Sequence, residues 1–118
     1  MSTPRLNELD ATAAARLLAR RELKAQDLVR ACLERVSERD DDIHAFAHLD
    51  AVSALAQAKA LDDGPIRGLL HGLPLGVKDL FDTTDLPTSY GSALYAGHRP
   101  ASDAASVALC REAGAVIL

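Results

Sequence analysis

Apolar residues recur at helical spacing in three stretches of the first half of the chain. These stretches predict helices over residues 11–20, 26–39 and 51–61, with Asp10 as the N-cap of the first helix. The side chains expected to face inward are Ala14, Leu17 and Leu18 in the first helix, Leu28, Val29, Cys32, Leu33 and Val36 in the second, and Val52, Leu55, Ala56 and Ala60 in the third.

Two polar breaks come after the second and the third of these helices. Three consecutive carboxylates at residues 40–42 are expected to end the second helix, because negative charge at a helix C-terminus opposes the helix dipole. Residues 43–48 then alternate between apolar and polar side chains, which predicts a short half-buried strand. The turn sequence at residues 62–65 divides the chain into a helical region, 1–63, and a second region, 64–118.

The second region is predicted to begin with a strand that leads to a lysine. Glycine and proline concentrate after residue 63, which is typical of loops in which backbones approach closely. Apolar residues alternate over 73–77 and predict a strand that reaches Lys78. A helix is expected over residues 104–113, with Asp103 as its N-cap and Gly114 at its C′ position.

Lys78 is the residue of this chain whose surroundings most favour catalytic chemistry. Of the three lysines, Lys24 lies in a polar turn and Lys59 lies on a helix beside Gln57, so both can stay in water. If the strand before Lys78 is covered on both faces, its ammonium loses hydration, which disfavours the charged form and makes the amine a candidate general base. The alternative is a lysine at a strand end whose ammonium reaches solvent.

Two serines lie beyond Lys78 in an ordered loop, and either could be nominated as a nucleophile. Neither Ser89 nor Ser92 lies in a Gly-x-Ser-x-Gly pattern, and serines in turns usually bond their own backbone, so we expect neither to attack a substrate. Asp79 could orient Lys78 or cap the segment after it. We expect the role of Asp79 to be one of local structure.

The four histidines show no pattern that predicts a metal site. His44 and His48 are expected on the polar face of strand 43–48, where both would be hydrated. His71 and His98 adjoin glycines in loops, and we expect His71 to form a structural hydrogen bond with the backbone.

Charge and composition exclude several classes of protein. The 118 residues carry a formal net charge of -4 and neither half is basic, so no nucleic acid partner is expected. The opening segment 1–5 lacks the apolar core of a secretory signal, and no run approaches the roughly 20 apolar residues that span a bilayer. We therefore expect a cytoplasmic protein that does not enter a membrane. Cys32 and Cys110 lack ligand spacing and are expected to be free thiols on helices.

Two stretches of the second region resemble the amidase signature family. One is His-Gly-Leu-Pro-Leu-Gly-Val-Lys-Asp at residues 71–79, and the other runs from Gly-His-Arg-Pro at 97–100 through Asp-Ala-Ala at 103–105 to Ala-Gly-Ala-Val-Ile at 113–117. The helices before them are similar to the N-terminal region of that family. The resemblance implies an α/β chain that forms the N-terminal part of the amidase signature fold, in which helices pack on a mixed β-sheet, and that is incomplete on its own.

The resemblance also implies a reaction. In that family a lysine at the position of Lys78 belongs to a Ser-cisSer-Lys triad that hydrolyses amides. The neutral lysine takes a proton, relayed through the bridging serine, from the serine that attacks the carbonyl, and glycine-rich backbone supplies oxyanion donors. Both serines lie, in the family, beyond a strand like the one at 115–118. The resemblance implies a carboxamide hydrolase without metal or cofactor, of which this chain holds only Lys78 and is inactive alone.

Two further interpretations remain open. One is the amidase-like subunit of a tRNA-dependent amidotransferase, which usually carries Asn where Leu80 follows Lys78 and Asp79 here. The other is a non-catalytic helical interaction module. The apolar residues 115–118 predict a buried strand, and we expect this strand and the strand of Lys78 to pair with another copy or with missing chain. The expected partners are thus an amide substrate, the remainder of an amidase chain and, as a homo-oligomer, further copies.

Overall fold

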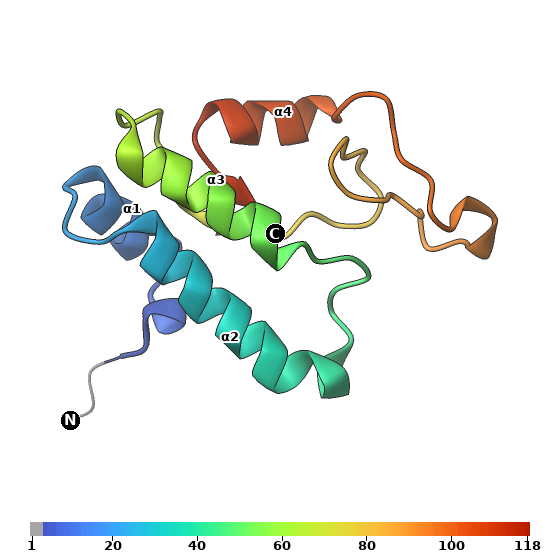
Figure 1. The fold of residues 1–118 in the computed structure, drawn as a ribbon, viewed down its shortest axis with the longest axis horizontal. Coiled ribbons are helices and arrows are strands. Elements are labelled where there is room, and N and C mark those ends of the chain that lie inside the picture. The colour runs from blue at the N-terminus through green and yellow to red at the C-terminus, as the bar shows by residue number, and fades with distance from the viewer. Residues whose placement is uncertain (1–3) are drawn as a thin grey trace.

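A computed structural model describes residues 4–118, so the first three residues of the opening segment 1–5 lie outside the described residues. Four α-helices pack around a small sheet, and the loop that carries the short turn Ala93–Tyr95 extends away from them (Figure 1). The elements in chain order are η1 (Leu6–Glu8), α1 (Ala11–Ala19), α2 (Ala25–Ile43), α3 (Ala51–Asp63), β1 (Pro74–Leu75), η2 (Ala93–Tyr95), α4 (Ala105–Glu112) and β2 (Val116–Ile117).

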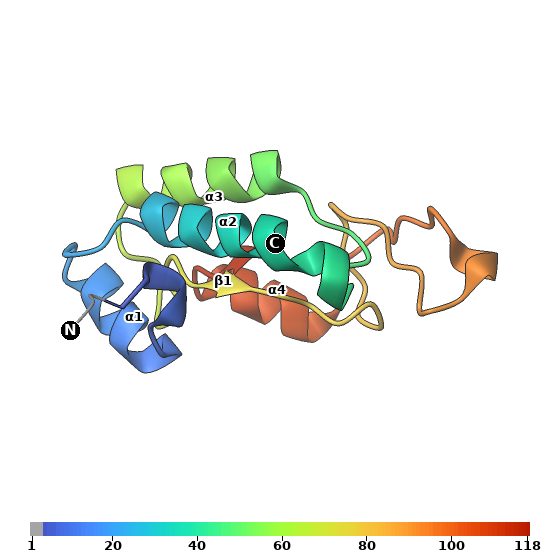
Figure 2. The same cartoon turned by 90° about the horizontal axis from the view of Figure 1, so that it is seen from below.

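The two strands pair with each other in parallel, with Pro74 opposite Val116 and Leu75 opposite Ile117. The sequence predicts that both strands pair with another copy or with missing chain. This prediction is wrong for the edge along which the two strands pair with each other. Figure 2 shows the sheet as a middle layer, with α2 and α3 on one side and α4 on the other. Because β2 is covered in this way, Val116 is 0% and Ile117 2% exposed.

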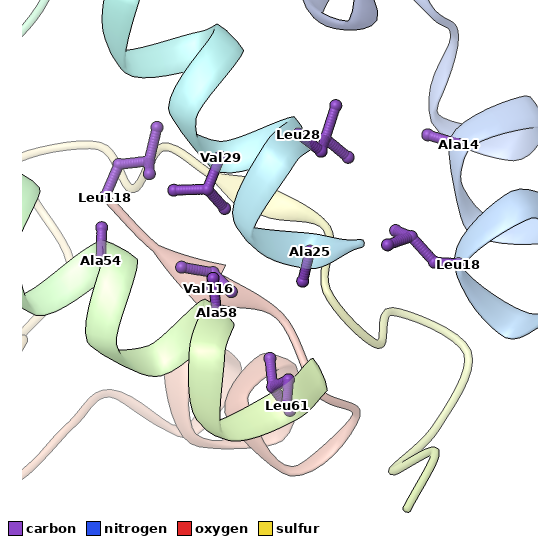
Figure 3. Packing of buried hydrophobic residues seen from close by; sticks show 10 residues of the cluster. All are labelled: Ala14, Leu18, Ala25, Leu28, Val29, Ala54, Ala58, Leu61, Val116 and Leu118. Carbon is purple, nitrogen blue, oxygen red and sulfur yellow. The ribbon is translucent and has the colours of Figure 1, made fainter. Parts of the chain in front are cut away.

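The core forms where the helices α1, α2 and α3 meet β2 (Figure 3). Alanines on α3 allow its backbone to approach β2 closely, and larger side chains from α1 and α2 fill the remaining space. Complete burial of one such leucine or valine contributes roughly 1.5–3 kcal/mol. The buried cluster consists of Ala14, Leu18, Ala25, Leu28, Val29, Ala54, Ala58, Leu61, Val116 and Leu118.

Polar contacts fix the ends of the first three helices. The carboxylate of Asp10 accepts a hydrogen bond from the Ala13 amide at 2.8 Å, which confirms Asp10 as the N-cap of α1. The N-terminus of α2 has no cap of its own, and the carboxylate of Asp62 at the end of α3 accepts from the amides of Ala25 at 2.7 Å and Gln26 at 3.0 Å. One carboxylate thus joins the end of one helix to the start of another.

The second helix is longer than predicted, and the strand expected after it does not form. Helix α2 continues through the three aspartates at 40–42 to Ile43, and His44 ends it in the left-handed conformation with a φ of 55°. The carboxylate of Asp40 accepts from the amide of Ala45 at 2.7 Å and so stabilises the turn after the helix. Exposed carboxylates keep their hydration, and this local hydrogen bond outweighs their unfavourable interaction with the dipole.

The inward face of α3 also differs from the prediction. Val52 is 82% exposed, and Ala56 and Ala60 are exposed as well. Alanine occupies so many positions around this helix that its apolar pattern does not select one face. The buried residues of this helix are Ala54, Ala58 and Leu61, and of the residues predicted to face inward only Leu55 packs, partly buried, against the core.

Helix α4 has the predicted end but a different start. Gly114 follows it with a φ of +96°, as the C′ prediction requires. Asp103 is not the N-cap, since Ala104 precedes the helix and makes no side-chain cap. The carboxylate of Asp103 instead accepts from the amide of Thr84 at 2.9 Å and from Nε of Arg111 at 3.0 Å, and so ties the helix to the preceding loop.

Candidate functional site

Lys78 lies in an irregular segment after β1, and its side chain is exposed among the described residues. The condition stated for its burial, a strand covered on both faces, is not met within residues 4–118, because the strand ends at Leu75, and the alternative of an ammonium that reaches solvent describes these residues. The backbone turns sharply here, because the carbonyl of Lys78 accepts hydrogen bonds from the amides of Leu80 at 2.7 Å and Phe81 at 3.1 Å. We call residues 76–81 the Lys78 turn.

The Lys78 turn borders a cavity of about 170 Å³. Its walls come from the connection between α2 and α3, from the loop at 86–88 and from the end of β2. Lys78, Asp79 and His48 therefore line one small space, although His48 lies far from the other two in the sequence. The other residues around it are Ala45, Phe46, Ala47, Val77, Phe81, Thr83, Leu86, Pro87, Thr88 and Leu118.

A chain of hydrogen bonds, which we call the Asp79–Ser89–His48 link, crosses this site. The carboxylate of Asp79 accepts from the amide of Ser89 at 2.7 Å, and Oγ of Ser89 lies 3.0 Å from Nε2 of His48. Asp79 thus has the structural role expected for it. Sequence reasoning missed His48, which was assigned to a hydrated strand face, and no local pattern pointed to a contact across 41 residues.

Further polar contacts hold the loop after the Lys78 turn. The hydroxyl of Thr88 accepts from the amide of Thr83 at 3.2 Å, and Thr83 donates to the carbonyl of Leu86 at 3.1 Å. The phenol of Tyr90 donates to the carboxylate of Asp82, and this hydrogen bond, with partial burial, raises the pKa of Tyr90. Thr83 and Thr88 are only 4% and 1% exposed, so this part of the molecule is stabilised by buried polar groups.

The remaining candidates have structural roles or lie apart. Oγ of Ser92 accepts from the amide of Leu94 at 3.3 Å, as expected for a turn serine. Nδ1 of the buried His71 accepts from the amide of Arg67 at 3.1 Å, which confirms the expected backbone bond. Burial, followed by the nearby positive charge of Arg21, lowers the pKa of His71.

Neither a metal site nor a disulfide emerges from residues 4–118. These residues contain no group of three or more His, Cys, Asp or Glu side chains arranged to hold a metal ion. His44 is exposed at the end of α2 and lies on no strand with His48. Cys32 and Cys110 are free thiols, and partial burial raises the pKa of Cys32. Within the same residues no helix is long and apolar enough to cross a membrane.

A larger groove of about 560 Å³ lies between α3 and α4, away from Lys78. Its charged side chains include Arg111, but that guanidinium already binds the carboxylates of Asp85 at 2.7 Å and Asp103 at 3.0 Å. The groove therefore offers volume without a lysine or histidine among the described residues that line it, and the smaller cavity beside Lys78 is the candidate site.

Comparison with known proteins identifies the family to which this chain belongs. The sequence pattern of the Amidase family matches residues 27–118, and the chain belongs to that family. Peptide amidase from Stenotrophomonas maltophilia has a structure similar to 94% of the chain, with a TM-score of 0.85 and 36% identity, and the match covers 24% of that enzyme. The predicted fold class is thereby confirmed: these residues have the architecture of part of an amidase signature enzyme.

Two kinds of relative are similar in sequence. AmiD of Mycobacterium tuberculosis is 40% identical over 98% of the chain, and the match covers 26% of that protein. A glutamyl-tRNA(Gln) amidotransferase subunit of Salinispora arenicola is 41% identical over 96% of the chain and 24% of its own length. The chain thus spans about a quarter of the length of the relatives it matches.

Proposed function

We propose that these residues are the N-terminal portion of an amidase that hydrolyses a carboxamide, with Lys78 as its catalytic base. The observation that carries the proposal is the state of the Lys78 side chain. It lines a cavity in the family-matched region, and it makes no hydrogen bond or ion pair with any residue of 4–118. The neighbouring carboxylate of Asp79 accepts from the Ser89 amide and forms no ion pair with Lys78 within residues 4–118.

The proposed reaction needs two serines that lie beyond these 118 residues. The neutral amine of Lys78 takes a proton through the bridging serine as the second serine attacks the amide carbonyl. The same proton goes to the leaving nitrogen when the C–N bond breaks, and water then hydrolyses the acyl-enzyme. Further protein over the cavity of about 170 Å³ would remove water from the ammonium and favour its neutral form. No residue of this chain replaces those serines, so we propose that residues 1–118 alone are inactive.

The test is turnover by the protein expressed through the natural end of its reading frame. A panel of carboxamides should be hydrolysed, and Lys78→Ala should reduce kcat by at least about 10³-fold, because loss of the base removes proton transfer from the attacking serine. Lys59→Ala is the matched control, since Lys59 is exposed on α3 and bound to Asp63. Turnover retained in Lys78→Ala would refute the assigned role.

A second candidate function rests on the similarity to the amidotransferase subunit of Salinispora arenicola. A protein of that kind would hydrolyse glutamine to release ammonia. Glutamine hydrolysis that exceeds hydrolysis of all other amides in the panel would favour this function over a free-standing amidase. Leu80 and Phe81 after Asp79 disfavour it, because the resemblance to that subunit implies Asn directly after Asp79.

The remaining expectations belong to the same proposal. They include the division into regions 1–63 and 64–118, the cytoplasmic location, the absence of a nucleic acid partner and the homo-oligomer. The alternative of an independent helical interaction module is tested by expressing residues 1–118 alone. A cooperative, monodisperse monomer would favour the module, whereas aggregation would favour a part of a larger domain.

A further inference from the structure

We infer that His48 and Ser89 are positioning residues that hold the Lys78 turn in its catalytic orientation. This inference rests on the proposed function, because it concerns the geometry of the proposed base. The residues that touch are Asp79, directly after Lys78, Ser89 in the following loop, and His48 between α2 and α3. The contact joins the Lys78 turn to the helical part of the molecule.

The Lys78 turn has few other attachments. Within residues 4–118, the hydrogen bond between Asp79 and the amide of Ser89 is the only one made by a side chain of residues 76–81. The two other bonds of this turn run between its own backbone groups, from Leu80 and Phe81 to the carbonyl of Lys78. Beyond its peptide connection to β1 and the half-buried Val77, the polar attachment of the turn to the helical part of the molecule therefore runs through Ser89.

His48 supplies that fixed point. Its ring is half-buried at the start of the chain segment that leads into α3, and its Nε2 lies 3.0 Å from Oγ of Ser89. Ser89 thus uses its amide toward Asp79 and its hydroxyl toward His48, so both its backbone and its side chain are held. Displacement of a catalytic group by about 1 Å can cost roughly 10²-fold in rate, which is the scale on which loss of this link would act.

The same contact could suggest a serine nucleophile activated by histidine, but the surroundings do not fit. A histidine base needs a third group that orients its other nitrogen. No carboxylate of residues 4–118 bonds Nδ1 of His48, and the carboxylate of the link bonds the amide of Ser89. The geometry is that of a contact that positions the Lys78 turn and does not activate Ser89 as a nucleophile.

The experiment measures kcat and KM of the full-length enzyme. Ser89→Ala and His48→Phe should each lower kcat about 10- to 100-fold and change KM less than about twofold, because proton transfer is misaligned while substrate contacts persist. Ser89→Thr keeps the hydroxyl, and His48→Gln places an amide near the position of Nε2, so both should retain most activity. Ser92→Ala is the matched control from the same loop. The double variant should be no slower than the worse single variant.

A second measurement does not depend on turnover. Hydrogen exchange at the amides of Leu80, Phe81 and Ser89 should accelerate at least tenfold in His48→Phe and stay unchanged in Ser92→Ala. Unchanged exchange and unchanged kcat in His48→Phe would overturn the inference, even where Lys78→Ala is inactive and the proposed function stands. If Lys78→Ala remains active, the proposed function fails, and with it the claim that a catalytic orientation is held. Labelling of Ser89 by a fluorophosphonate, which reacts with activated serines, would overturn the inference in favour of a nucleophile.

Discussion

The helical part of the molecule and the segment from residue 76 to 104 are stabilised by different means. In the helical part, leucines, valines and alanines from α1, α2 and α3 bury their side chains against β2. Between 76 and 104 the buried residues are Thr83, Thr88 and Pro100, and carboxylates and hydroxyls make the long-range contacts. Figure 1 shows this segment extending away from the packed helices.

The difference separates a scaffold from a site. Apolar burial is non-directional and tolerates small shifts, whereas a hydrogen bond requires its partners at one distance and angle. The Lys78 turn is attached through directional contacts to a scaffold held by non-directional ones. Changes in the first part should therefore alter stability, and changes in the second should alter local geometry.

The largest effect is expected from a cavity in the scaffold. Leu18 on α1 is 2% exposed, and Leu18→Ala should lower the free energy of unfolding by about 2–5 kcal/mol through lost burial and an unfilled space. Leu94 is 93% exposed in η2, so Leu94→Ala is the control and should change the free energy of unfolding by less than about 0.5 kcal/mol. Urea unfolding measures both. Equal losses of stability in Leu18→Ala and Leu94→Ala would mean that apolar burial in the helical part does not stabilise the fold.

The next largest effect is expected from a substitution at Gly114, where the backbone lies close to that of His71. A Cβ on Gly114, whose φ is +96°, would lie 2.7 Å from Cα of His71, so Gly114→Ala should cost about 2–3 kcal/mol from steric overlap and backbone strain. Gly97 also has a positive φ, +76°, but a Cβ there meets nothing within 4 Å. Gly97→Ala should therefore cost about 1 kcal/mol, from strain alone. Thermal unfolding of both variants separates the contribution of steric overlap from that of backbone strain. Similar losses of stability in the two variants would contradict the contribution of steric overlap.

A smaller effect is expected inside the polar segment. Thr88→Val keeps the shape of the side chain but leaves the amide of Thr83 without its acceptor, which should cost about 1–3 kcal/mol. Thr12→Val, at an exposed position of α1, is the control for the same substitution. Hydrogen exchange should show the loss confined to the loop around Thr83. Loss of protection spread evenly over α1 and α2 would show that the two parts do not differ.

Sequence reasoning predicted the scaffold better than the site. Asp10, the inward Leu28 and Val29, and Gly114 follow from local patterns, because caps, helical faces and left-handed turns are determined by nearby residues. The end of α2 was mispredicted because the carboxylate of Asp40 bonds the next turn and does not oppose the helix.

The candidate site depended on contacts that no local pattern contains. Lys78 was identified by its apolar, glycine-rich surroundings, but its exposure depends on how much protein covers it. His48 and Ser89 are separated by 41 positions, and each alone has the pattern of a hydrated polar residue. Tertiary proximity decides such roles.

The smallest expected effect is a pH dependence that originates in the buried His71. Burial and the positive charge of Arg21 lower its pKa in the folded chain below the ordinary value of 6.5. Below pH 6.5 the unfolded chain therefore binds a proton that the folded chain does not, and the free energy of unfolding decreases as the pH falls toward the folded pKa. One proton limits the slope to about 1.4 kcal/mol per pH unit.

Urea unfolding between about pH 5 and pH 8, a range that brackets the ordinary pKa of histidine, measures this slope. The comparison is with a variant that has no histidine at position 71. His71→Asn keeps an acceptor near the position of Nδ1, which bonds the amide of Arg67, and should flatten the profile below the ordinary pKa. His44→Asn, a substitution of the same kind at an exposed histidine, is the matched control. An unchanged slope in His71→Asn would show that the pH dependence does not originate in His71.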